Sequence, residues 1–275
     1  MARIRQTFGA CRFERWNDIS KDKVESELSK LDVESSTYNH YLTAIRHFCG
    51  WMVDNDRAVT SPVAKMGRLN VVKRERRRAL SFEEMCNLLA ATEKAPNRFG
   101  MTGHERAVLY LVAVETGLRV RELQNLKVCS FDLDNSTVTL EPEFCKNRQS
   151  AEQLLKMKRA DQLRAFFAGK ESNDRAFNMP SNFRTAKMLY ADLDDTDIDQ
   201  TGVVFHSLRH TLATELDKSG ASEKERKTVM RHSDRSDLTL GIYTHVRRYD
   251  LRQTIEKLPD YLWPGEKQQQ KEKIA

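Results

Sequence analysis

Histidine, arginine and tyrosine side chains gather in one stretch of this chain, between His206 and His245. The stretch holds four of the seven histidines, an arginine between two of them (Arg209) and Tyr243. Together these side chains can supply a proton acceptor, an anion clamp and a hydroxyl nucleophile. Such a set suits chemistry at a phosphodiester, which develops negative charge on its oxygens and needs cations to stabilise it.

The spacing of the first three polar residues favours one shared face. His206, Arg209 and His210 lie at i, i+3 and i+4, so that on a helix their side chains are neighbours. Two histidines at this spacing can also bind zinc. Against a metal site stands the charge of Arg209, and no acidic residue lies between the histidines as in the HExxH pattern. A single helical histidine is more often an ordinary surface or core residue, so other motifs must decide.

Two motifs in the right order are more specific than any single residue. The segment His-Ser-Leu-Arg-His from His206, then Met-Arg-His232-Ser-Asp, then Tyr243-Thr-His resembles the second half of the tyrosine recombinase (phage integrase) signature. The first half of that signature, Thr-Gly-Leu-Arg-x-x-Glu-Leu, matches residues 116–123. The sequence departs from the family at Arg231, where many members have glycine. Since arginine does not easily adopt a positive φ, we expect a different local turn or an added phosphate contact there.

The resemblance implies a site-specific DNA recombinase or integrase that cleaves and rejoins DNA strands through a covalent 3′-phosphotyrosyl intermediate, with no metal, ATP or other cofactor. Tyr243 would be the nucleophile, and Tyr249 and Tyr261 are nearby alternatives. His210 and His245 also match the family pattern and are expected to be structural. The catalytic residues implied by the resemblance are Arg119, Lys146, His206, Arg209, His232 and Tyr243.

Each of the six has an implied role at the phosphate. The two arginines would clamp it, because guanidinium is planar, permanently charged and bidentate. His206 would assist removal of the tyrosine proton, and His232 would hydrogen-bond a phosphate oxygen. Lys146, in a Lys-Asn-Arg segment, would protonate the leaving 5′ oxygen from a hairpin. Without the resemblance, Lys146 would be interpreted as a solvated loop residue.

Several elements must position these residues. Apolar residues at helical spacing predict a helix from Thr37 to about Asp54, and a short helix before it is only weakly indicated. Ser81 with Glu84 predicts a capping box at a helix start. A buried helix over 105–116 should end at Gly117. Alternation over 131–140 predicts a strand pair around an Asp-Asn-Ser turn.

The remaining segments are expected to be mainly helical. Residues 151–200 are predicted to be helical, except for an acidic segment, 192–199, interpreted as a solvated loop rather than a calcium site. Ser222 predicts the start of another helix. Residues 251–262 predict an amphipathic C-terminal helix, which in the family docks onto a neighbouring protomer.

Composition and charge bound the domain organisation. The net charge is +6, and residues 1–78 hold 16 basic and 10 acidic residues, so the whole excess lies there. We expect a short helical core-binding, DNA-binding domain (1–72), a basic linker (73–78), a catalytic domain (79–262) and a polar tail (263–275). The fold class is mainly α with a small antiparallel β-sheet (α+β): the resemblance implies a tyrosine-recombinase catalytic fold preceded by a small helical core-binding (SAM-like) domain.

Partners, location and alternative functions follow from the same features. The five cysteines show no CxxC spacing, and no apolar run approaches the length of a membrane span, which favours a cytoplasmic protein without a membrane partner. The resemblance implies double-stranded DNA as substrate, a monomer in solution and a homo-tetramer on paired recombination sites. Two alternatives stay open: a catalytically idle DNA-binding accessory protein of a mobile element, and a relaxing type IB-like topoisomerase.

Overall fold

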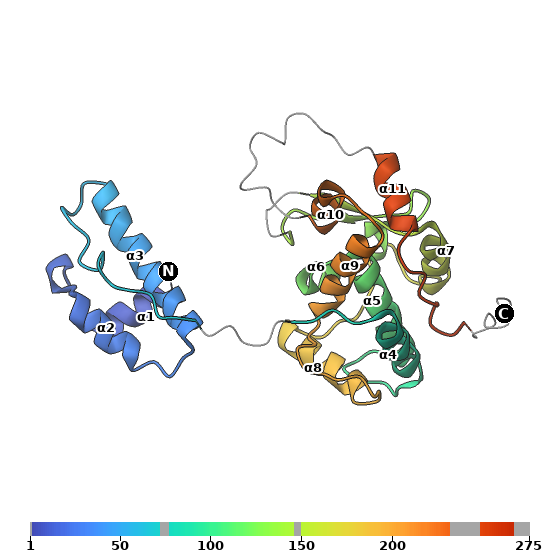
Figure 1. Cartoon of the computed structure of the whole chain (residues 1–275), viewed down its shortest axis with the longest axis horizontal. Coiled ribbons are helices and arrows are strands. Elements are labelled where there is room, and N and C mark those ends of the chain that lie inside the picture. Colours follow the sequence, from blue (N-terminus) through green and yellow to red (C-terminus); the bar gives the residue numbers. More distant parts are fainter. Residues whose placement is uncertain (1, 72–76, 146–149, 232–247, 267–275) are drawn as a thin grey trace. The chain divides into compact units, whose positions relative to one another are not determined.

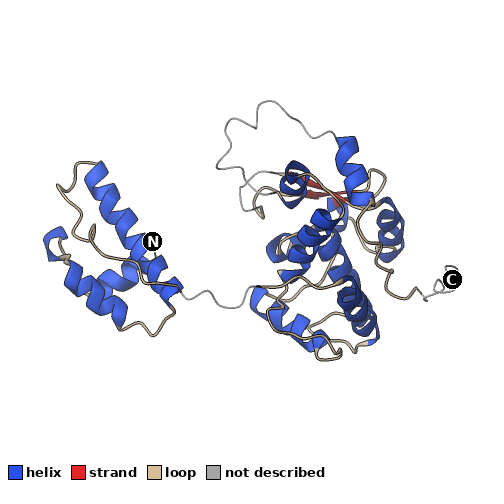
Figure 2. Ribbon diagram, in the orientation of Figure 1, coloured by secondary structure: helices blue, strands red, loops and turns tan. Residues whose placement is uncertain are grey.

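A computed structural model of the chain describes residues 2–71, 77–145, 150–231 and 248–266. The chain divides into two compact units, Met1–Glu75 and Arg76–Ala275 (Figure 1). Helices dominate both units, and three short strands form an antiparallel sheet in the larger one (Figure 2). The predicted fold class, mainly α with a small antiparallel sheet, is therefore confirmed.

The smaller unit is built on a long helix, as the apolar stripe after Thr37 predicts. Its buried face includes Leu42, Ile45 and Cys49, which are fully buried against Val24 of the preceding helix. The segment before residue 35 contains more structure than the single short helix predicted, because its first helix buries little and so shows no apolar stripe. The elements are α1 (Ala2–Ala10), a 3-10 turn (Trp16–Asp18), α2 (Lys21–Ser29) and α3 (Ser35–Asp54).

The larger unit places one buried helix at its centre. Helix α5 is buried along almost its whole length and packs against α4 on one side and α9 on another (Figure 1). The predicted stop at Gly117 is confirmed, since this residue ends α5 with a φ of 63°. The helices are α4 (Phe82–Lys94), α5 (Gly103–Thr116), α6 (Val120–Gln124), α7 (Met157–Phe166), α8 (Asn182–Leu193), α9 (Ser207–Lys218), α10 (Glu223–Met230) and α11 (Arg248–Glu256).

The sheet confirms the predicted strand pair and adds a third strand. Strand β1 (Phe131–Asp132) pairs with β2 (Thr137–Leu140), and β2 pairs with β3 (Ala151–Leu154), all antiparallel. The prediction of helix over 151–191 is wrong for these four residues, and it is also wrong for residues 167–181, which connect α7 to α8 without a helix. The strand conformation of β3 depends on β2, which supplies the hydrogen bonds, and a pattern within residues 151–154 alone does not contain that partner.

The prediction of a solvated acidic loop over 192–199 is wrong for Asp192, whereas the four later aspartates are exposed and lie after the end of α8. Asp192 is fully buried near the end of α8, where its carboxylate accepts hydrogen bonds from Arg106 Nε at 2.9 Å and from the Tyr110 hydroxyl at 2.7 Å. Arg98 also pairs with it, at 3.3 Å. Because buried charges are stable only when paired, this network joins α5 to α8 and explains the burial.

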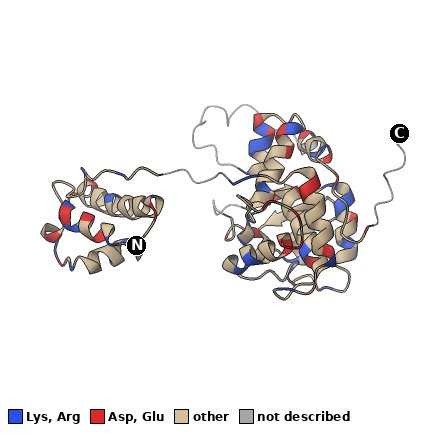
Figure 3. Cartoon of the chain, turned by 60° about the horizontal axis from the view of Figure 1, so that its bottom comes forward, with Lys and Arg blue, Asp and Glu red and all other residues tan. Residues whose placement is uncertain are grey.

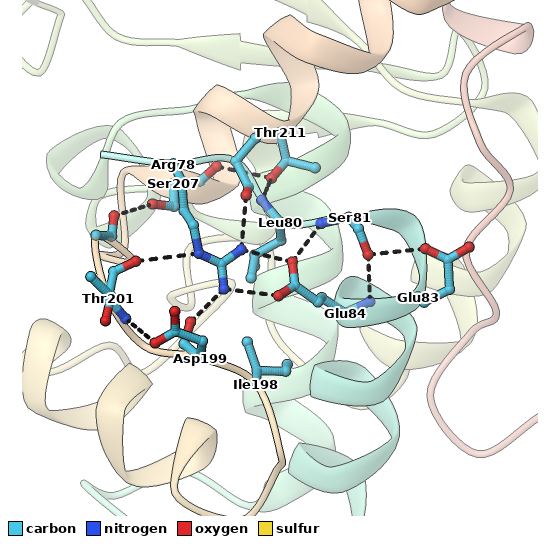
Figure 4. Close-up of polar contacts among 12 residues, drawn as sticks. Arg78, Leu80, Ser81, Glu83, Glu84, Ile198, Asp199, Thr201, Ser207 and Thr211 are labelled. Atoms are coloured by element: carbon cyan, nitrogen blue, oxygen red, sulfur yellow. Dashed lines mark hydrogen bonds and ion pairs between the residues drawn. The ribbon is translucent and has the colours of Figure 1, made fainter. Parts of the chain in front are cut away.

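The start of the larger unit is fixed to α4 and α9. The Arg78 guanidinium forms two 2.8 Å hydrogen bonds with the Glu84 carboxylate and also donates to the Asp199 and Thr201 carbonyls (Figure 4). The Leu80 N–H donates to Thr211 Oγ1 of α9 at 2.9 Å. The basic side chain of Arg78 is therefore engaged within this unit, where it joins α4 to the segment that leads into α9.

Other predicted features lie at the two ends of the unit. The capping box is confirmed, since the Ser81 N–H donates to Glu84 at 2.8 Å and the Glu84 N–H donates to the Ser81 hydroxyl at 3.1 Å. The C-terminal helix ends at Glu256, earlier than predicted. Beyond it, Tyr261 stacks on Phe82 with ring centroids 5.4 Å apart, so the segment packs against its own chain.

Charged residues of both signs are interspersed on both units (Figure 3). Over the part of the chain that the structure describes, no helix has the length and apolar character needed to cross a membrane.

Candidate active site

Three of the six predicted catalytic residues lie in the described part of the larger unit. Arg119, His206 and Arg209 come from the start of α6 and the start of α9. Lys146, His232 and Tyr243, with His245, lie outside the described residues.

Arg119 follows directly on the turn that ends α5. Gly117 adopts the left-handed conformation, which favours glycine, and a β-carbon there would lie 2.7 Å from Leu212 Cδ2 of α9, so the Leu212 side chain would have to shift. Arg119 then stands at the N-cap of α6, where its own N–H donates to Glu122 Oε2 at 2.7 Å and its Nη1 donates to Oε1 at 3.0 Å. Its side chain is 30% exposed, so it is open to a ligand from solvent.

Arg209 is held inside the unit by backbone oxygens. It is only 3% exposed, and its Nη1 and Nη2 donate to the carbonyls of Gly117 and Met230. These contacts fix the guanidinium between the ends of α5 and α10. Burial, followed by the charges of Arg119 and Arg231, lowers the pKa of Arg209 to about 10. Even so, the group stays cationic at neutral pH, which makes it a fixed positive charge with no bonded carboxylate among the described residues.

His206 and His210 lie on one helical face, as predicted. Their rings meet edge to face with centroids 4.9 Å apart at the first turn of α9. Burial, with the charges of His210, Arg209, Arg77 and Arg119, lowers the pKa of His206 to about 4. The pKa of His210 is also lowered, by burial and by Arg77 and Arg209. His206 is therefore neutral at pH 7, which leaves a ring nitrogen able to accept a proton.

Glu122 joins two arginines, Arg119 and Arg231. It is 2% exposed, and besides Arg119 it accepts a 2.6 Å hydrogen bond from Arg231 Nη2. Burial acts to raise the pKa of Glu122, but the bonds and charges of the two arginines outweigh burial and lower it. The expectation that Arg231 avoids a positive φ is wrong, since it ends α10 at φ 48° and ψ 48°. The only signal in the sequence that pointed to Arg231 was an arginine at a position where many family members have glycine, and this signal did not identify Glu122 as its partner.

The arrangement is suited to binding an anion. Arg119, Arg209 and Arg231 bring three guanidinium groups around the single carboxylate of Glu122, beside a neutral histidine. Positive charge in such excess, partly buried, favours a phosphate or another anionic group. In the described segments, no group of three or more His, Cys, Asp or Glu side chains is placed to hold a metal ion.

Comparison with known families agrees with this geometry. The family model of the phage integrase family matches residues 78–249. A tyrosine recombinase XerA of Saccharolobus solfataricus is 26% identical over 243 residues, covering 86% of this chain and 72% of the relative. A tyrosine recombinase XerD of Chlorobaculum tepidum is 26% identical over 236 residues, covering 82% of this chain and 76% of the relative.

Solved structures of similar fold include two enzymes bound to DNA. The Tn1549 transposon integrase in complex with a circular intermediate DNA superposes with a TM-score of 0.65 and 13% identity, covering 92% of each chain. The XerH site-specific recombinase bound to its difH substrate superposes with a TM-score of 0.60 and 16% identity, covering 84% of this chain and 71% of that one. At these identities the likeness concerns the fold.

Proposed function

The chain belongs to the phage integrase family, and from this premise we propose that it is a tyrosine-type site-specific recombinase that cleaves and rejoins DNA strands through a covalent 3′-phosphotyrosyl intermediate. The observation that carries the proposal is the cluster of Arg119 and Arg209 beside a neutral His206. It supplies fixed cations for a phosphodiester and a proton acceptor in the same place.

The arginines stabilise the charge that develops during cleavage. As the phosphorus becomes five-coordinate, negative charge builds on its two non-bridging oxygens. Arg209 is immobilised by the Gly117 and Met230 carbonyls, which leaves its other N–H donors for the phosphate. Arg119 is more exposed and approaches from the start of α6. Because both groups are fixed before the substrate arrives, little reorganisation is needed in the transition state.

His206 serves as the proton acceptor for the nucleophile. A histidine that carried a proton at pH 7 could not accept another, and burial, together with the nearby charges of His210 and the arginines, keeps this one neutral. In the cleavage step, the Tyr243 oxygen forms a bond to phosphorus while its proton passes to His206. The bond from phosphorus to the 5′ oxygen breaks, and Lys146 gives that oxygen a proton.

The product of cleavage keeps the energy needed for rejoining. The phosphotyrosyl ester replaces one phosphate ester by another, so the 5′-hydroxyl of a second strand can attack it and release Tyr243. In this scheme His232 donates a hydrogen bond to a non-bridging oxygen. The reaction runs without ATP or a metal ion.

Double-stranded DNA is the proposed substrate, and paired recombination sites held by four protomers are the proposed assembly. The integrase and the recombinase of similar fold were solved with DNA, which supports a DNA substrate for this family member. The net charge of +6 also favours a polyanionic partner. We propose that the protein is a monomer without DNA.

Nicked duplexes test the covalent step directly. Duplexes from DNA flanking the gene, each with a nick that lets the 5′-hydroxyl fragment diffuse away, are incubated with the protein in EDTA and separated on a denaturing gel. We expect a slowly migrating, protease-sensitive band with the wild type and none with Tyr243→Phe. A band that persists in Tyr243→Phe would contradict the assignment of the nucleophile.

Arg209→Lys is the matched test of the cation site. Lysine keeps the charge but cannot bond two carbonyls and a phosphate at fixed angles, so we expect a loss of cleavage rate of about 100-fold.

Duplex binding that depends on salt but gives no adduct on any flanking DNA would favour the accessory-protein alternative. Relaxation of supercoiled plasmid without strand exchange would favour the topoisomerase.

A further inference from the structure

Arg231 occupies a backbone conformation that arginine does not favour. It ends α10 with φ 48° and ψ 48°, in the left-handed region, whereas glycine fills the equivalent position at the end of α5. A side chain there costs about 1–2 kcal/mol relative to the ordinary helical region. Strained residues persist where the surrounding structure requires them, so the conformation of Arg231 indicates that its side chain has a role.

The side chain of Arg231 is bound to a buried carboxylate that is shared with Arg119. Arg231 Nη2 lies 2.6 Å from Glu122 Oε2, and the same oxygen accepts the Arg119 N–H at 2.7 Å. The other oxygen, Oε1, accepts Arg119 Nη1 at 3.0 Å. Arg119 is therefore held by one side-chain hydrogen bond to Glu122, while Arg231 occupies the oxygen that would complete a bidentate pair.

Exposure separates the two arginines. The side chain of Arg119 is 30% exposed and that of Arg231 is 14% exposed, and the Glu122 side chain beneath them is 1% exposed. Arg231 Nε is buried and has no hydrogen-bond partner within the described residues. Arg119 is thus more open to a ligand from solvent than Arg231 is, and both bind the buried carboxylate.

Two guanidinium groups, those of Arg119 and Arg231, bind this one carboxylate, and the buried Arg209 adds a third positive charge nearby, so the cluster holds an excess of positive charge. Burial, followed by the charges of Arg119 and Arg231, lowers the pKa of Arg209, as expected for cations that lie near one another. If Arg231 were neutral, Glu122 would attract Arg119 more strongly and balance more of its charge. The presence of Arg231 therefore favours an Arg119 that is available to an external anion.

We infer that Arg231 is a positioning residue for the phosphate site, which binds one oxygen of Glu122 so that Arg119 remains free to bind the substrate phosphate. This inference rests on the proposed function of the Arg119 and Arg209 cluster. The same hydrogen bond joins the end of α10, next to His232 in sequence, to the start of α6. Arg231 thus connects the two halves of the recombinase motif through a residue that the family pattern does not contain.

Binding of inorganic phosphate tests this role without any cleavage of DNA. The full-length protein is labelled with 15N-arginine, and phosphate is added at constant ionic strength while the Nε–H signals of Arg119 and Arg209 are followed by NMR. For Arg231→Gly we expect phosphate to bind about tenfold more weakly, as a loss of one charge-assisted contact at Arg119 implies. Arg231→Lys keeps the charge and a donor for Glu122, and should retain most of the affinity.

A double-mutant cycle with Glu122→Gln separates positioning from direct contact. If Arg231 acts through the carboxylate, then Arg231→Gly has little further effect on phosphate affinity once Glu122→Gln is present. An equal tenfold loss in both backgrounds would show that Arg231 touches the phosphate itself and would overturn the inference. An unchanged affinity of Arg231→Gly alone would also overturn it, and would leave Arg231 as a helix end only.

Two further measurements serve as controls for phosphate binding: the urea midpoint of Arg231→Gly and the formation of a DNA adduct by the wild type. In Arg231→Gly the lost ion pair and the relieved backbone strain oppose each other, so we expect little change in the urea midpoint. The proposed function fails separately: a wild type that binds phosphate in the expected Arg231-dependent way, yet forms no adduct with DNA, would refute the recombinase assignment and support the positioning role. A wild type whose Arg119 signal does not respond to phosphate would refute the positioning role.

Discussion

At the scale of single residues, the site depends on charges that are fixed before any substrate binds. Arg209 is secured by two carbonyls, and Arg119 is secured by Glu122. Burial, together with positive charges that include theirs, holds His206 in its neutral form. The three side chains are therefore one electrostatic unit, in which a change at one group alters the protonation or the orientation of the others.

The low pKa of His206 implies that the free energy of unfolding depends on pH. In the unfolded chain this histidine takes up a proton near its ordinary pKa of 6.5, whereas in the folded protein it does so only near pH 4. Between these values the unfolded state binds more protons, so the contribution to stability is full above pH 6.5 and is lost as the pH falls toward 4. Urea unfolding at pH 7.5 and pH 5 should therefore show a smaller loss of stability on acidification in His206→Asn than in the wild type. Equal losses in the two proteins would show that His206 titrates normally.

At the scale of elements, the end of α5 and the face of α9 are matched in shape. Gly117 lies against Leu212 with no room for a side chain, and this close approach places its carbonyl next to Arg209. The sheet packs into the core of this unit through Phe131, Val138 and Leu140. Helix α11 adds polar contacts beside the strands, since Arg252 donates to the Leu155 carbonyl and, at 2.8 Å, to that of Asn135.

Gly117→Ala should be strongly destabilising for two separable reasons. The positive φ costs about 1–2 kcal/mol for any side chain, and the clash with Leu212 adds about 1–3 kcal/mol. Gly169→Ala is the matched control, because Gly169 has a φ of +84° but no atom within 4 Å of the added β-carbon. Urea denaturation of both variants should show the larger loss at Gly117. Equal losses would mean that the close approach to α9 contributes nothing.

The buried network between α5 and α8 gives a second prediction at this scale. Asp192→Ala leaves the fully buried Arg106 without its carboxylate, which should cost about 3–5 kcal/mol. Asp134→Ala removes the exposed 2.9 Å pair with Arg164, and should cost less than about 1 kcal/mol. Denaturant unfolding of the two variants compares a buried with an exposed acidic partner. A small effect at Asp192 would indicate that water or another group compensates Arg106.

At the scale of the whole molecule, each unit has an apolar core of its own. Leu42 and Ile45 belong to the core of the smaller unit, and Leu111 and Val112 belong to that of the larger unit. Stability is therefore expected to be a property of each unit, because the contacts that bury these residues come from within it.

Calorimetry tests whether the two cores melt separately. Leu42→Ala removes fully buried atoms from the smaller unit and should cost about 2–5 kcal/mol there. We expect it to lower one unfolding transition and leave the other in place, and we expect Leu111→Ala to do the reverse. If either substitution shifts all of the unfolding heat together, the two cores form one cooperative system.

The features that were predicted correctly from the sequence are those whose cause lies within a few neighbouring residues. The capping box at Ser81, the helix stop at Gly117 and the strand pair after Phe131 depend on neighbours a few residues away, and all three are present. The shared face of His206 and His210 follows from helical spacing in the same way. These features are encoded within one turn of helix or one hairpin, so the pattern contains what is needed.

Features that depend on distant partners were not predicted. Asp192 looks like a solvated acid until Arg106, 86 residues away, is placed beside it. Strand β3 has too few residues for a pattern of its own and exists because β2 offers a hydrogen-bonding edge. Likewise, Arg231 breaks a local backbone preference for the sake of Glu122, 109 residues earlier. In each case a tertiary contact outweighs the local preference.

The two carbonyls that hold Arg209 also restrict how the chain can change its length. One belongs to Gly117 and the other to Met230, so both helix ends must stop at a given residue for the guanidinium to be bound. An insertion or deletion of one residue in α5 or α10 would rotate that helix end by about 100° and turn its carbonyl away. Homologous chains should therefore vary in length within the connecting loops and keep these two helix ends in register.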